Sequence, residues 1–105
     1  MIDVTDQNFA KEVLQSERPV FACFTGRQCL HCIPVCLIAD DLMDRYGERV
    51  KFVRIDVQAS REMSKAYDVT AVPSIILFHN ARMIKKLIGY QEKSALMEML
   101  DALLK

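Results

Sequence analysis

Short apolar runs that fit buried strands alternate along this chain with apolar residues at helical spacing. The runs VFACF and SIILF are continuous, as in strands covered on both faces. The expected strands in this part of the chain are 2–4, 20–24, 49–57 and 74–78. The first expected helix has Thr5 as its N-cap and an apolar stripe of Phe9, Ala10, Val13 and Leu14. The others are one that begins near Cys29 and one at 60–67. Because parallel strands need a long crossover rather than a tight turn, the alternation predicts a parallel sheet joined by helices.

The last third of the chain breaks that alternation. HNAR (79–82) reads as a turn, and MIKKLIG (83–89) as its antiparallel partner, with adjacent lysines that suit an edge strand. Residues 92–105 place their leucines on one helical face. The predicted order is β-α-β-α-β-α-β-β-α, an α/β fold with a mixed sheet of about five strands flanked by about four helices. A chain of 105 residues fits a single domain over 1–105.

Charge and hydropathy indicate which partners and which cellular location this protein is expected to have. Fourteen basic and 14 acidic residues give a formal net charge of zero, which disfavours nucleic acid or an acidic membrane as a partner. The start of the chain has no basic and apolar leader pattern, and no apolar run approaches the ~20 residues that span a bilayer. We therefore expect a cytoplasmic protein. Structural disulfides are rare there, so clustered cysteines suggest redox chemistry or metal binding.

Cys29 and Cys32 form a C-x-x-C motif between a predicted buried strand and a predicted helix. Recurring Leu30, Ile33, Leu37 and Leu42 suggest that the helix begins near Cys29. Unpaired backbone N–H groups at a helix start favour a thiolate, whereas Cys32, one turn later, should be more buried and higher in pKa. This asymmetry predicts that Cys29 attacks a disulfide and that Cys32 resolves the mixed disulfide.

With this motif in place, the chain resembles the thioredoxin family over its whole length. VTDQNF, CLHC, FVRIDV, YDVTAVPSIILF and LIGYQEKSALMEMLDALL follow the family's order and spacing. The resemblance implies the thioredoxin fold, with Pro73 as the family's cis-proline and the Val72 backbone pairing with an extended substrate. It also implies protein disulfide substrates and an electron donor. We expect no cofactor beyond the Cys29–Cys32 disulfide, no metal, and a monomer.

Several positions depart from the family pattern. They are Gln28 for the tryptophan before the dithiol, Leu30-His31 for glycine-proline within it, Cys23 for a buried aspartate, Leu37 for a helix proline, and Ala81 for the hairpin-turn glycine. Pro34 is expected to loosen the first helical turn, because it lacks a backbone N–H. Loss of the tryptophan and of the flat Gly-Pro surface changes what can dock. The resemblance therefore leaves the electron donor open, as a reductase or another thiol.

His31 occupies the position that is also histidine in protein disulfide isomerases and in the periplasmic thiol oxidase. A positive charge or hydrogen-bond donor there stabilises the Cys29 thiolate and so makes the disulfide more oxidising. Each pKa unit is worth about 30 mV, so one to three units, with help from Arg27, move the potential from about −270 mV to about −240 to −180 mV.

The other two cysteines fit two interpretations each. Cys23, in place of the aspartate, removes a base for the resolving cysteine and would lengthen the life of mixed disulfides; alternatively, it is a small core residue. Cys36 lies four residues after Cys32 on the same helical face. It is either a packed apolar residue or a regulatory or competing thiol.

Two other classes of function stay open at this point. The cysteines with His31 could hold zinc or an iron–sulfur cluster. However, Cys29 and Cys36 lie about 10 Å apart along one helix, too far for a single ion to bridge easily. A thioredoxin-fold adaptor could hold a partner without turnover, although the retained dithiol argues against this.

Overall fold

The computed structural model describes residues 1–105, and its elements follow the predicted order. The strands are β1 (Ile2–Val4), β2 (Val20–Thr25), β3 (Lys51–Asp56), β4 (Ser74–His79) and β5 (Arg82–Ile88). The helices are the π-helix η1 (Ala10–Leu14), α1 (Cys32–Tyr46), α2 (Arg61–Ala66) and α3 (Lys93–Leu103). None of these helices has the length and hydropathy that crossing a membrane requires.

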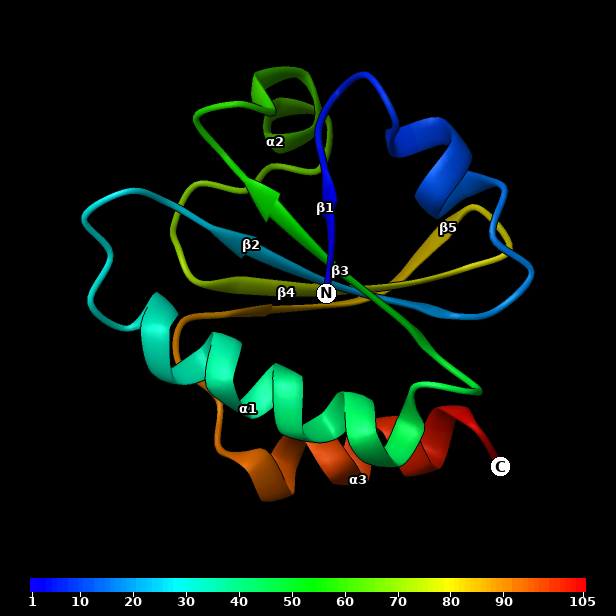
Figure 1. Cartoon of the computed structure of the whole chain (residues 1–105). Helices are drawn as coiled ribbons and strands as arrows, with labels where there is room; N and C mark the ends of the chain where they lie inside the picture. Colours follow the sequence, from blue (N-terminus) through cyan, green and yellow to red (C-terminus); the bar gives the residue numbers. More distant parts are fainter.

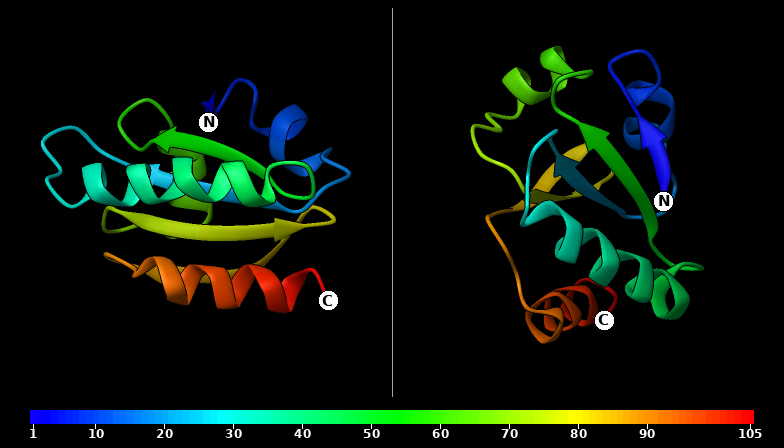
Figure 2. Two further views of the ribbon diagram at one scale, coloured as in Figure 1. Left: turned by 60° about the horizontal axis from the view of Figure 1, so that its bottom comes forward. Right: turned by 60° about the vertical axis from the view of Figure 1, so that its left-hand side comes forward.

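The five strands form one mixed sheet in the order β1-β3-β2-β4-β5. β1, β3 and β2 are parallel, whereas β4 and β5 add antiparallel pairs, so the predicted edge hairpin is confirmed. Helices α1 and α3 cover one face and η1 and α2 the other (Figures 1 and 2). The chain has the thioredoxin fold that its pattern predicts.

The central strand β2 contributes side chains to both hydrophobic cores, because successive side chains of a strand point to opposite faces of the sheet. Phe21 and Cys23 pack with α1 and α3, whereas Ala22 and Phe24 pack with the η1 side. On the α1 side, the buried Tyr46 hydroxyl donates a 2.7 Å hydrogen bond to Asp101 Oδ1 and joins α1 to α3. Cys23 therefore lies completely buried beneath α1.

The helix α1 begins about one turn later than the sequence predicts, and most of the apolar residues that suggested it are exposed. The helix begins at Cys32, and Leu30, Ile33 and Leu37 are 82%, 62% and 61% exposed. Pro34 explains the shift: it has no N–H for the Leu30 carbonyl, so the first helical bond runs from Val35 N–H to the His31 carbonyl. The buried face consists of Cys32, Val35, Ala39, Leu42 and Tyr46. The apolar residues that suggested a helix thus lie largely in solvent.

The hairpin turn between β4 and β5 contains a strained residue. Asn80 and Ala81 both have positive φ, at 55° and 65°. Two such residues characterise the two-residue turn that matches strand twist, and glycine is favoured there because it lacks a Cβ.

We predict that Ala81→Gly stabilises the protein by about 1 kcal/mol, because it removes the cost of a left-handed Cβ residue. Thermal unfolding measures the change. Ala102→Gly is the matched control: Ala102 is exposed within α3, so the same substitution should destabilise by about 1 kcal/mol. An Ala81→Gly protein that melts below the parent would contradict the strain at this turn.

Candidate active site

The loop between β2 and α1 carries the C-x-x-C motif at the carboxyl end of the central parallel strands. Cys29 and Cys32 are joined by a disulfide, with their Cα atoms 5.3 Å apart. Cys29 lies in the turn just before α1, and its carbonyl accepts a 3.3 Å bond from Cys32 N–H. The helix terminus therefore falls at Cys32 rather than at Cys29, although the dithiol still adjoins it.

The two cysteines differ in access to solvent. Cys32 is buried at 5% exposure, whereas Cys29 is partly exposed at the edge of the loop. The predicted difference in burial is confirmed. Cys29 is therefore the more accessible cysteine of the pair.

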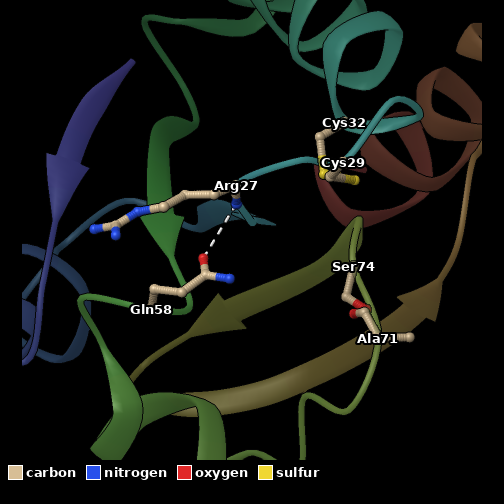
Figure 3. The surroundings of a disulfide bond; sticks show 6 residues. All are labelled: Arg27, Cys29, Cys32, Gln58, Ala71 and Ser74. Carbon is tan, nitrogen blue, oxygen red and sulfur yellow. Dashed lines mark hydrogen bonds between the residues drawn. A yellow bond between two sulfur atoms is a disulfide. The ribbon is translucent and has the colours of Figure 1, made fainter.

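The loop that leads into β4 lies at the same edge of the sheet. Phe24 of β2 pairs with Ser74 of β4, which brings the two loops together. The Val72–Pro73 peptide bond is cis, as expected. Ser74 Oγ donates a 2.6 Å hydrogen bond to the Ala71 carbonyl and closes the turn around this bond (Figure 3).

Gly26 lets the two loops approach closely. A Cβ at this position would lie 3.1 Å from Val72 Cγ2, tighter than ordinary packing. Val72 and Pro73 thus border the loop that carries Cys29 and Cys32.

The structure does not bring Arg27 to the dithiol. Its guanidinium lies 3.8 Å from the Asp56 carboxylate and points away from the disulfide, while its backbone N–H donates to Gln58 Oε1 at 3.1 Å (Figure 3). His31 is exposed between the cysteines and precedes α1, with no side-chain hydrogen bond to the helix. Of the two side chains expected to tune the dithiol, Arg27 is paired with Asp56, whereas His31 makes no hydrogen bond to the helix.

A pocket of about 950 Å³ opens beside the disulfide, between α1 and the β1–β3 edge. Cys29, Cys32 and Cys36 line its α1 side. Arg54 and Asp3 line the opposite side and form a 2.8 Å ion pair, which holds the pKa of Asp3 below its usual range. Three of the four cysteines therefore border one solvent-accessible space.

Cys23 and Cys36 interact with each other beneath this pocket, and both are free thiols. A hydrogen bond with the Cys23 thiol, aided by Arg54, lowers the pKa of Cys36 to about 7. The same contact with Cys36, together with burial, raises the pKa of Cys23 well above its usual range. The pair thus consists of a buried thiol that donates and a half-buried sulfur that accepts.

Sequence reasoning missed Arg54. It pairs in register with Cys23, and side chains at paired positions point to the same face of a sheet. The strand sequence KFVRID contains a sign of this placement. Arg54 follows Phe52 by two residues and therefore lies on the same face of the strand, and Phe52 packs in the α1 core. Arg54 is exposed, but an arginine on the same strand face as a buried phenylalanine indicates a nearby anion or polar site.

The structure shows no set of side chains that could hold the zinc ion or iron–sulfur cluster considered from the sequence. No group of three or more histidine, cysteine, aspartate or glutamate side chains lies close enough together to hold an ion.

A strand-to-helix dithiol with one accessible and one buried sulfur, on this fold, defines a thiol–disulfide oxidoreductase.

The family model for thioredoxin matches residues 1–102. Thioredoxin C-2 of Corynebacterium nephridii is 26% identical, over 96% of this chain and 94% of that protein. Thioredoxin of Rickettsia felis is 29% identical, over 94% of each. The bifunctional thioredoxin reductase/thioredoxin of Mycobacterium leprae is 29% identical over 91% of this chain, which matches 21% of that protein. The chain belongs to the thioredoxin family.

Proposed function

We propose that Cys29 is the nucleophile and Cys32 the resolving cysteine in exchange with protein disulfides. The difference in their exposure carries this assignment. The Cys29 thiolate attacks one sulfur of the substrate disulfide, and the other leaves as a thiolate that takes up a proton. Cys32 loses its proton and attacks Cys29, which releases the second substrate thiol. The substrate gains two electrons and the protein retains the Cys29–Cys32 disulfide.

The exposed surface beside Cys29 supports a polypeptide as the substrate. Leu30 and Ile33 are large, apolar and mostly exposed on either side of His31. The Val72–Pro73 segment lies at the same edge, where its backbone would pair with an extended chain. An apolar rim with a backbone edge suits an unfolded or extended segment rather than a small polar disulfide.

The remaining parts of this proposal follow from the family and from the sequence. Oxidised protein returns to the dithiol through a reductase or another thiol, and the fusion named in Mycobacterium leprae supports a reductase as the partner class. The protein acts as one monomeric domain in the cytoplasm. This exchange uses the Cys29–Cys32 pair as its redox group, with no other cofactor, and it needs no metal.

Insulin reduction separates this function from that of a non-catalytic adaptor. With dithiothreitol as the electron source, the protein should accelerate insulin precipitation catalytically, at protein concentrations far below that of insulin. An adaptor would bind a partner without turnover. If the rate with protein equals the rate with dithiothreitol alone, the proposed function is wrong.

His31 should make the dithiol more oxidising than that of ordinary family members. We predict that His31→Ala lowers the reduction potential by about 30 mV for each unit by which His31 depresses the pKa of Cys29. Glutathione equilibration measures the potential. His79→Ala is the matched control. His79 is the chain's other histidine, and it lies at the last residue of β4, whereas the Val72–Pro73 loop beside the dithiol precedes the first. Equal potentials in all three proteins would show that His31 does not tune the thiolate.

A further inference from the structure

Two cysteines outside the C-x-x-C lie together on different elements. Cys23 belongs to the central strand β2 and Cys36 to helix α1, and they meet in the core cluster between sheet and helix. Both sulfurs are free, and Cys36 packs against the core cluster that contains Cys23, where the two thiols can hydrogen-bond. The thioredoxin exchange derived above uses neither of them.

A dissolved molecule can reach only one of these two cysteines. Cys23 is 0% exposed, so no external molecule can reach its sulfur. Cys36 lines the pocket beside the disulfide and is only partly buried. Any reaction with a dissolved oxidant must therefore begin at Cys36, with Cys23 behind it as the second sulfur.

We propose that Cys23 and Cys36 are a second redox-active dithiol, which closes to a disulfide between β2 and α1 when a low-molecular-weight disulfide enters the pocket. The Cys36 thiolate attacks one sulfur of the small disulfide and expels the other as a thiol. Cys23 then gives up its proton and attacks the Cys36 sulfur, which expels the second small thiol. Two protein thiols are oxidised and one disulfide is reduced to two thiols.

The electrostatics of the pocket support the first step. The Cys23 thiol donates to Cys36, and Arg54 and the N-terminal amino group favour the thiolate, whereas burial and Asp40 oppose it. The net effect lowers the pKa of Cys36 to about 7, so the thiolate at neutral pH is favoured more than in an ordinary cysteine. A thiolate beside a buried thiol reproduces the asymmetry of the first pair, one helical turn further along α1.

The test uses the Cys29→Ser, Cys32→Ser double variant, so its outcome does not depend on whether the first pair exchanges. The variant is oxidised with glutathione disulfide, free thiols are blocked with N-ethylmaleimide, and the protein is digested with trypsin. Cleavage after Arg27 places Cys23 and Cys36 on separate peptides. We expect a linked pair of peptides that mercaptoethanol separates, and the loss of both alkylatable thiols.

Two matched variants in the same background sharpen the result. With Cys23→Ala, the Cys36–glutathione mixed disulfide should persist, because nothing resolves it. Iodoacetamide should also react with Cys36 at pH 7 on the order of tenfold more slowly once the donor is lost. With Cys36→Ala, Cys23 should stay unmodified.

If the double variant folds poorly, as judged by circular dichroism, the same linked peptides are sought in wild-type protein. Free thiols on both cysteines, or a stable Cys36–glutathione adduct while Cys23 is present, would overturn the proposal.

Discussion

Replacing Cys29 by serine should reduce insulin reduction on the order of a thousand-fold or more, because a serine hydroxyl is not ionised at neutral pH and cannot attack a disulfide. Cys29 is the more exposed cysteine of the C-x-x-C, and Cys32, at 5% exposure, is poorly placed to attack a disulfide in a partner protein. The rate of turbidity in the insulin assay, with dithiothreitol held constant, measures the loss.

Cys32→Ser is the matched variant, because it retains the attacking sulfur and removes only the second step. It should also lose turnover, but it should accumulate a mixed disulfide with a substrate protein through Cys29. Non-reducing electrophoresis against insulin or a labelled peptide disulfide detects the adduct. An adduct on Cys29→Ser and none on Cys32→Ser would reverse the roles of the two cysteines.

The second large effect concerns the stability of the helix that carries Cys32. Leu42 is 1% exposed on α1, and Leu37, five residues earlier, is 61% exposed. We predict that Leu42→Ala destabilises the protein by about 3 kcal/mol, through lost burial and a cavity, which lowers the melting temperature by about 10 °C or more.

Leu37→Ala is the matched control and should change the free energy of unfolding by less than about 0.5 kcal/mol. Urea unfolding of both variants against the parent measures the difference. Both leucines belong to the recurrence that predicted this helix, and hydrophobicity alone does not distinguish them. Comparable losses of stability in the two variants would contradict the difference in burial that the structure shows.

These leucines show why the sequence predicted the order of elements better than the faces of one helix. The short strands are recognised by continuous apolar runs, and each of them forms. On α1, however, Ile33 and Leu37 stand on the exposed side, while cysteine, alanine and tyrosine supply much of the buried face beside Leu42. Residue hydrophobicity therefore indicates a helix here but misplaces its inner face, and only packing against α3 and the sheet decides it.

The sequence also predicted the residue types of the site better than the contacts between them. The C-x-x-C and Pro73 are recognisable in the chain because their residue types are rare and their chemistry is specific. The contact of Cys23 with Cys36 depends on strand alternation and helix rotation together, 13 residues apart in sequence (36 − 23). Arg54 reaches this place only through the pairing of β3 with β2. Interactions that need the register of two elements cannot be read from either element alone.

Apart from Ala81 in the β4–β5 turn, the departures from the family pattern lie on β2, on α1 and in the loop between them. A cysteine replaces the buried carboxylate beneath α1, another cysteine faces it, and a histidine replaces the proline between the redox sulfurs. The protein thus retains the dithiol of its family while the groups around it have a different chemistry. We expect these groups to change the potential and the oxidation states of the site rather than to abolish exchange.

The reduction potential of the Cys29–Cys32 pair tests this account most directly. The protein is equilibrated with mixtures of reduced and oxidised glutathione, quenched in acid, and the thiols of Cys29 and Cys32 are counted by alkylation and mass spectrometry. The account predicts a reversible two-electron transition at about −240 to −180 mV. A potential at or below about −270 mV, or no reversible transition, would contradict it.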